Sequence, residues 1–170
     1  MSYNNYFLQY IIFIMIILVN SCGIYSFTGA SIPEEANTIC VDYIKNEANL
    51  VEPNLSNTLT ENLINKCLTE TSLNLKDGEG DITFSGKIIN YAVKPISIQN
   101  NETAAQNRLS IAIEIIYRNK LDESKNFKKT FIHYADFESQ NNFSDIELEL
   151  NQIIINNLVE DIFNQAFSNW

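Results

Sequence analysis

Residues 109–117 alternate between apolar and polar side chains more strictly than any other part of the chain. A period of two places successive side chains on opposite faces of a β-strand. The pattern therefore predicts a strand with one face in a core, and a fold built around a sheet. The apolar face holds Leu109, Ile111, Ile113, Ile115 and Tyr117, and the other face holds mainly Ser110, Ala112, Glu114 and Arg118.

Three further segments have the character of strands. Residues 38–44 alternate, with Ile39, Val41 and Tyr43 on one side. In residues 82–93 the apolar side chains change phase, which predicts one long strand with a β-bulge near Ile89. Residues 127–137 predict a fourth strand, whose mixed faces indicate partial cover on both sides. Residues 95–106, between the strand segments 82–93 and 109–117, have no period and predict a long loop.

Two segments have helical spacing. After Pro53, apolar residues recur at every third or fourth position to near Leu73. Later, Ser144 is the expected N-cap and Glu147 completes a capping box, which predicts a long helix ending almost at Trp170. The resulting order β-α-β-β-β-α predicts an α+β two-layer sandwich, with a four-stranded mixed sheet and two helices on one face, in one domain over residues 37–170.

The N-terminal region is a separate module. Residues 1–21 contain no charged side chain, and residues 7–19 are almost wholly apolar, a length typical of a signal peptide. Ser21 precedes Cys22, and this ending resembles a bacterial lipobox, although Asn20 is unusually polar and residues 1–6 lack Lys and Arg. We expect residues 1–21 to be removed, Cys22 to be lipidated and residues 22–36 to be a tether. The alternative is an uncleaved anchor.

Composition argues against nucleic-acid binding and against catalysis. The formal net charge is −10, and no basic cluster exceeds Lys128 and Lys129. His133 is the only histidine and lies in a predicted strand without a nucleophile motif. Carboxylates near residues 145–149 fit a helix N-terminus. No Cys or His pattern has metal-ligand spacing. We therefore expect no nucleic-acid partner, no metal, no cofactor and no enzymatic activity.

Two cysteines remain in the mature chain, Cys40 and Cys67. In an oxidising compartment such a pair permits a disulfide. Cys67, however, shares the core-facing period of Leu59 and Leu63, and Cys40 lies in an extended segment. Burial as small apolar side chains is the favoured interpretation.

Four segments resemble the Bacteroidetes branch of the LptE family of lipopolysaccharide-assembly lipoproteins. They are residues 22–33 (CGIYSFTGASIP), 84–88 (FSGKI), 101–109 (NETAAQNRL) and 159–164 (VEDIFN), together with the final Asn-Trp. The resemblance implies an acylated outer-membrane protein that plugs the LptD β-barrel, assists its assembly and contacts lipopolysaccharide. Gly23, which differs from an inner-membrane retention signal, agrees with that location.

The resemblance also directs attention to two sets of candidate site residues. The loop segment over residues 96–107 is the expected LptD contact, although its side chains could instead only fix local turns. Cations on the strands are candidates for lipopolysaccharide phosphates, through charge-assisted hydrogen bonds, with ordinary solvated side chains as the alternative. The barrel candidates are Asn101, Glu102, Thr103 and Asn107, and the lipopolysaccharide candidates are Arg108, Arg118, Lys128 and Lys129.

Two other functions stay open. One is a periplasm-facing lipoprotein that carries a lipid in a cavity between sheet and helices. The other is a scaffold lipoprotein of a different envelope machine, such as a secretin pilot or a barrel-assembly accessory. A filled core would disfavour the lipid carrier, and the co-purifying barrel would separate the rest.

Overall fold

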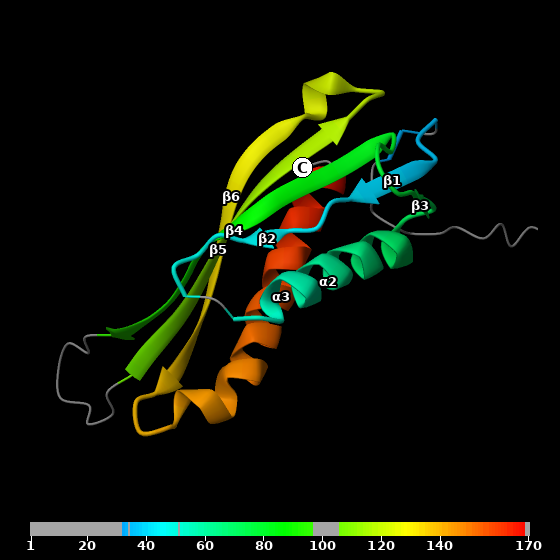
Figure 1. The fold of residues 1–170 in the computed structure, drawn as a ribbon. Helices are drawn as coiled ribbons and strands as arrows, with labels where there is room; N and C mark the ends of the chain where they lie inside the picture. The colour runs from blue at the N-terminus through cyan, green and yellow to red at the C-terminus, as the bar shows by residue number, and fades with distance from the viewer. Residues whose placement is uncertain (1–31, 34, 51, 97–105, 169–170) are drawn as a thin grey trace, which may run out of the picture.

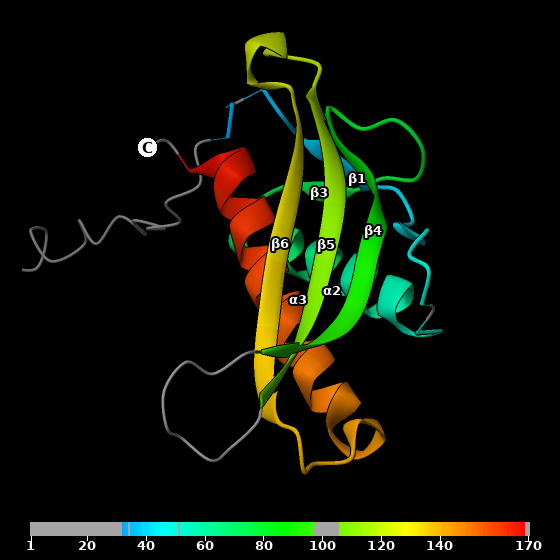
Figure 2. The same ribbon diagram turned by 90° about the vertical axis from the view of Figure 1, so that its left-hand side faces the viewer.

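The computed structural model describes residues 32–33, 35–50, 52–96 and 106–168. They form two layers, a six-stranded mixed sheet and two helices that cover the same face of it (Figures 1 and 2). The strand order is β3-β1-β4-β5-β6, and β2 also pairs with β4. The α+β class is confirmed, whereas the predicted four strands are too few. The elements are β1 (Thr38–Val41), β2 (Lys45–Asn46), α2 (Leu55–Glu70), β3 (Asn74–Leu75), β4 (Ile82–Ile96), β5 (Gln106–Asn119), the 3₁₀ helix η1 (Glu123–Lys125), β6 (Phe127–Glu138) and α3 (Phe143–Phe167).

The strand expected over residues 38–44 is shorter than predicted: β1 ends at Val41, and the two-residue strand β2 begins at Lys45. Between β1 and β2, the three residues 42–44 lie beside only the two residues 85–86 of the neighbouring β4. The extra residue reverses the alternation, so Ile44 is fully buried while Tyr43 is 55% exposed. The prediction that Tyr43 lies on the same side of one strand as Ile39 is therefore wrong. The Ile44 backbone N–H donates to Thr60 Oγ1 of α2 at 3.1 Å, which fixes the irregular segment to the helix.

β4, β5 and β6 form an antiparallel meander of long strands. The β4–β5 register shifts once, between Ile88 and Asn90, which confirms the predicted β-bulge. Pairing then continues to Ile96 opposite Gln106. The loop expected over residues 95–106 is therefore shorter at both ends than predicted, and its remaining part lies outside the described residues.

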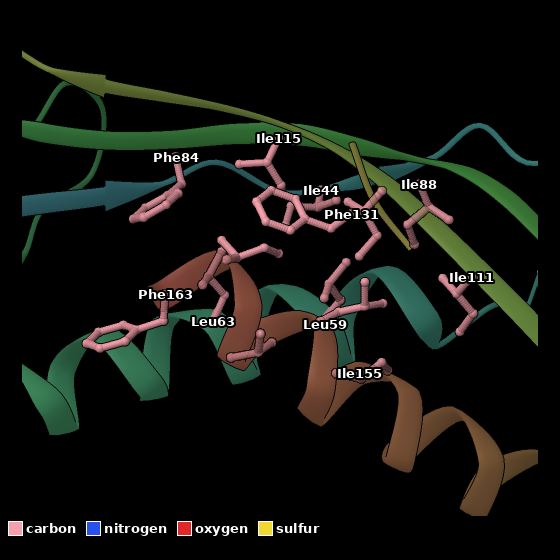
Figure 3. Packing of buried hydrophobic residues seen from close by; sticks show 14 of the residues in the cluster. Ile44, Leu59, Leu63, Phe84, Ile88, Ile111, Ile115, Phe131, Ile155 and Phe163 are labelled. Carbon is pink, nitrogen blue, oxygen red and sulfur yellow. The ribbon is translucent and has the colours of Figure 1, made fainter. Parts of the chain in front are cut away.

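The core lies between the sheet and the two helices (Figure 3). Leu59 and Leu63 of α2 and Ile155 of α3 meet Ile111 and Ile115 of β5 there, and all five side chains are buried. The strict alternation of residues 109–117 is confirmed, because every apolar side chain on the predicted inner face is buried. At one end of the core, the Phe84 and Tyr117 rings lie 5.1 Å apart, centroid to centroid.

The C-terminal helix begins earlier than its capping pattern predicts. α3 starts at Phe143 after Asn142, which makes no side-chain capping bond. The Phe143 ring lies 5.7 Å from the Phe137 ring, so packing against β6 places the first turn. Glu147 accepts a hydrogen bond from the Tyr91 hydroxyl at 2.7 Å. The predicted N-cap at Ser144 is therefore wrong.

β6 is covered on one face only, contrary to the expectation from its mixed composition. Phe131 and Phe137 are buried toward the helices, whereas Ile132 is 63% and Tyr134 51% exposed on the opposite face. Figure 2 shows α2 and α3 behind the sheet, with the other face of β4, β5 and β6 turned to the viewer. We call this uncovered side the open face.

Cys40 and Cys67 are both buried free thiols. Burial raises the pKa of Cys67 to about 12, and desolvation together with Asp42 raises the pKa of Cys40. The favoured interpretation of both residues as buried small side chains is confirmed. Neither α2 nor α3 is long and apolar enough to cross a membrane.

Candidate interaction surface

The open face carries the charged side chains that the sheet itself positions. Directly opposite residues of antiparallel strands point to the same face, so each row across β4, β5 and β6 can be read from the register. One row joins Lys94, Arg108 and Asp136 near the β4–β5 loop. Toward the other end, Arg118 lies opposite Thr83 and Lys128 opposite Ile116. Both ends of the open face therefore carry cations.

Arg108 is held in a fixed geometry. Its Nε and Nη2 donate to the two carboxylate oxygens of Asp136 at 2.6 and 2.8 Å. The guanidinium carbon lies 3.6 Å from the centroid of the Tyr134 ring, a cation–π contact. These hydrogen bonds raise the pKa of Arg108 and lower the pKa of Asp136. A phosphate could meet the guanidinium only by sharing it with Asp136.

Lys94 is a cation that the sequence reasoning missed. It is exposed, near the end of β4, and lies directly opposite Arg108. The sequence does carry a signal for it, because Asn90, Ala92 and Lys94 alternate after the bulge and so share one face. Two cations placed directly opposite repel each other, and an anion bound between them would relieve that repulsion.

The four predicted lipopolysaccharide candidates do not form one cluster. Arg108 and Arg118 are ten residues apart on β5, about 33 Å along a strand. Lys128 forms an ion pair with Glu114 at 3.2 Å, and Arg118 forms none with a described carboxylate. Lys129 points to the helix side, where its Nζ donates to Gln165 of α3. The open face thus holds three of the four.

The four predicted barrel-contact residues are also divided. Asn107 lies in β5 opposite Pro95 and Phe137, on the helix side of the sheet, and is half-buried. Asn101, Glu102 and Thr103 lie outside the described residues, as does the predicted lipidation site Cys22. The described residues on either side of this segment, Ile96 and Gln106, pair with each other at the same ends of β4 and β5 that carry Lys94 and Arg108.

His133 connects two elements. Its Nε2 lies 2.7 Å from Asp161 Oδ2, so the ring ties β6 to α3. Within the described ranges, no three His, Cys, Asp or Glu side chains are grouped so that they could hold a metal ion. The arrangement around His133 is thus a contact between strand and helix.

Two surface hollows are lined mostly by polar side chains. One, of about 580 Å³, lies between β6 and the last turns of α3. The other, of about 420 Å³, lies between α2 and α3 and is lined largely by amides such as Asn62, Asn65 and Asn156. Both are open to solvent, and a continuous cluster of buried apolar side chains fills the space between sheet and helices.

Comparison with known families identifies the chain. A model of LptE, described as lipopolysaccharide-assembly, matches residues 36–166, from just before β1 to the end of α3. The chain belongs to the LptE family. The sequence resemblance to this family is therefore confirmed. No curated protein sequence matches the chain.

Two solved structures share the fold of this LptE-family chain at low sequence identity, and a third matches it less closely. A homolog of neuraminyllactose-binding hemagglutinin from Helicobacter pylori has 8% identity and a TM-score of 0.55, covering 83% of this chain and 88% of its own. The hypothetical protein CT253 from Chlamydia trachomatis has 10% identity and a TM-score of 0.50, with 77% and 98% covered. A minor lipoprotein from Acinetobacter baumannii has 14% identity and a TM-score of 0.49, with 76% and 91% covered.

Proposed function

We propose that this chain is an outer-membrane lipoprotein that plugs an LptD-type β-barrel, helps to assemble it and assists lipopolysaccharide transport to the cell surface. The observation that carries the proposal is the match of the LptE lipopolysaccharide-assembly family to residues 36–166. In this proposal the chain acts by binding and has no enzymatic activity.

The proposed attachment to the membrane is through Cys22. An acylated cysteine at the start of the mature chain adds about 0.8 kcal/mol per buried CH₂, so several acyl chains hold a protein on a bilayer stably. Residues 22–36 would then join the anchor to the domain, which begins with β1 at Thr38.

The outer surface suits a hydrated barrel interior. The lumen of a transmembrane β-barrel is polar, so a plug must present satisfied polar groups to it. On the open face, Arg108 pairs with Asp136 and Lys128 with Glu114, so these charges are compensated within the chain. A cluster of buried apolar side chains is packed between the layers, which allows the domain to keep its fold before it meets a barrel.

The proposed lipopolysaccharide contact lies where β4 ends and β5 begins. Arg108 offers a planar guanidinium suited to phosphate, and Lys94 lies opposite it on the same face. The adjoining Asn101, Glu102 and Thr103 are the proposed barrel contacts. Arg118 and Lys128 remain second candidates at the far end of the open face.

Affinity purification of the native lipoprotein from membranes tests the proposal. We expect mass spectrometry to find an LptD-type barrel as partner and an acylated Cys22 as the N-terminus. Replacing both Glu102 and Thr103 with Ala should reduce barrel recovery, whereas Asn57→Ala on the exposed side of α2 should not. Acylation without any barrel would instead support a lipid carrier or another envelope machine, and an intact Met1 would contradict the lipoprotein assignment.

Photo-crosslinking distinguishes a plug from a protein docked beside the barrel. A photoreactive residue at Ser110 samples the open face, and one at the exposed Thr69 of α2 samples the helix side. A barrel that surrounds the domain should be captured from both positions, and the buried Ile155 should capture nothing and serves as the control. Capture from one face alone would contradict insertion into the lumen.

A further inference from the structure

β6 presents a long edge of the sheet. It is the last strand in the sheet order, and its pairing with β5 runs from Tyr117↔Phe127 to Gln106↔Glu138 without a register shift. Its twelve residues include no proline. Proteins usually protect such an edge by proline, a bulge, a short strand or charged side chains, because unpaired backbone groups otherwise accept another strand. Within the described residues, β6 has no proline and no bulge and is not short, and its charged side chains are grouped by sign at its two ends.

The charges of β6 select the direction of an added strand. Lys128 and Lys129 lie at its start, and Asp136 and Glu138 lie at its end. A second β6 placed parallel and in register would put lysine beside lysine and carboxylate beside carboxylate. An antiparallel second β6 would instead put each basic end beside an acidic end. The strand is therefore electrostatically complementary to an inverted copy of itself.

We propose that the exposed edge of β6 pairs antiparallel with β6 of a second copy of this chain. A two-fold axis at Ile132 gives the register, because residues opposite each other must share a sheet face. On the open face, Ile132 then meets Ile132, and Lys128 meets Asp136 of the other copy. The homodimer forms by way of one continuous sheet, between copies that are not inserted in a barrel, because a barrel that surrounds the domain would cover the β6 edge.

The same register matches side chains on both faces. On the open face Thr130 lies opposite Tyr134, and the exposed Ile132 side chains, each 63% accessible in the single chain, cover one another. On the helix side Phe127 lies opposite Phe137, an aromatic cross-strand pair of the kind that stabilises sheets. Alternation and charge thus agree on one alignment.

The surface beside β6 leaves room for the second strand. The hollow of about 580 Å³ is lined by four consecutive residues, Lys129, Thr130, Phe131 and Ile132. Because consecutive side chains of a strand point to opposite faces, a hollow lined by all four runs along the edge itself. Asp161 and Gln165 of α3 form its far wall. In the proposed register, the helix-side residues that would enter it are His133 and Ala135 of the second copy.

Cysteine cross-linking of the full-length lipoprotein in native membranes tests the register. With copper(II) phenanthroline as oxidant, Ile132→Cys should give a disulfide dimer, because directly opposite Cα atoms lie within disulfide reach. Thr130→Cys alone should not, since its two copies are offset by four residues, about 13 Å. A mixture of Thr130→Cys and Tyr134→Cys chains should cross-link again.

Sedimentation of the purified, detergent-solubilised chain measures the affinity. Ile132→Lys places two lysines opposite each other at the axis and should weaken dimerisation by about tenfold or more. Ile89→Lys, at an exposed position away from this edge, should leave dimerisation unchanged. Unfolding curves of both variants show whether either change damages the fold.

The outcomes separate this proposal from the barrel-plug function. Equal cross-linking by Ile132→Cys and Thr130→Cys, no cross-link at Ile132, or a cross-link from Ile132 only to another protein would overturn the β6 homodimer. If no dimer forms and the barrel still co-purifies, the barrel function is supported and the β6 homodimer is not. If the β6 dimer forms and no barrel is recovered, the homodimer is supported and the barrel function is not.

Discussion

Gly86 lies where β4 runs closest to the backbone of β5. A Cβ at this position would overlap the carbonyl oxygen of Glu114 and would lie 2.9 Å from Ile115 Cδ1. The overlapped atom belongs to the backbone of a central strand, so it cannot move without disturbing the ladder. The absence of a side chain is therefore a requirement of the β4–β5 pairing.

Gly86→Ala should destabilise the domain. Overpacking of this kind costs about 1–3 kcal/mol of the free energy of unfolding. Urea unfolding followed by circular dichroism measures the loss, and Ser85→Ala, one residue earlier and on the open face, is the matched control with little expected effect. A Gly86→Ala variant as stable as the parent would show that the two strands can separate without cost.

Side-chain partners far apart in the sequence are the least predictable features at this scale. The pattern around Ser144 and Glu147 matches a local capping box, but Glu147 binds the Tyr91 hydroxyl, 56 residues away. Burial and this hydrogen bond raise the pKa of Tyr91. Local spacing contains no information on Tyr91, so the pattern predicts a helix start that is too late.

Among the elements, β1 is tied to the start of β4 by one carboxylate. Asp81 Oδ2 accepts hydrogen bonds from Thr38 Oγ1 at 2.7 Å and from the backbone N–H groups of Thr38 and Asn37 at 2.9 and 3.1 Å. These hydrogen bonds, the one from the Thr38 hydroxyl first, lower the pKa of Asp81. The charged carboxylate thus adds three hydrogen bonds to the few backbone pairs that the four-residue strand β1 makes.

Asp81→Asn should lower the free energy of unfolding at neutral pH. The difference in this free energy between variant and parent should become smaller in acid. Because the folded-state pKa of Asp81 is lowered, its contribution is present above the unfolded-state pKa of about 4 and is lost as pH falls through the folded-state value. Thermal unfolding at pH 7 and at pH 3 measures both differences. Asp77→Asn, in the same turn, is the control, and an Asp81 difference independent of pH would contradict the assignment.

Long periodic elements are predictable from this sequence, and short or irregular ones are not. α2, α3 and the three long strands each show a repeated spacing, and the bulge near Ile89 appears as a change of phase. β2 and β3 have two residues each, too few to alternate. The exposure of Ile132 and Tyr134 escapes prediction because a mixed composition like that of β6 also fits a strand covered on both sides.

For the whole molecule, the decisive arrangement is a sheet with one covered and one open face. Residues that are adjacent in a strand point to opposite faces of this sheet. Lys128 therefore pairs with Glu114 on the open face, and Lys129 contacts Gln165 on the helix side. Strand parity predicts that these adjacent lysines diverge. It does not predict that Asp136 engages Arg108, because the β5–β6 register depends on tertiary packing.

Replacing Lys94 and Arg108 together with Ala should weaken lipopolysaccharide capture. Charge-assisted hydrogen bonds contribute about 1.5–3 kcal/mol each, so their combined loss should lower affinity by about tenfold or more. Binding of purified lipopolysaccharide to the native lipoprotein measures the effect. Lys120→Ala, at the opposite end of β5 where Lys120 pairs with Glu79, is the control. Equal losses in both proteins would indicate only a general charge effect.

Because both helices lie on one side of the sheet, the two layers differ in charge. α3 contains five carboxylates, Asp145, Glu147, Glu149, Glu160 and Asp161, and neither Lys nor Arg. The strands β4, β5 and β6 carry six Lys or Arg side chains against three carboxylates. The domain therefore has an electric dipole across its thickness. Although the chain is acidic as a whole, an anionic membrane surface would attract the sheet layer and repel the helix layer. The domain would therefore be oriented with its sheet facing the membrane.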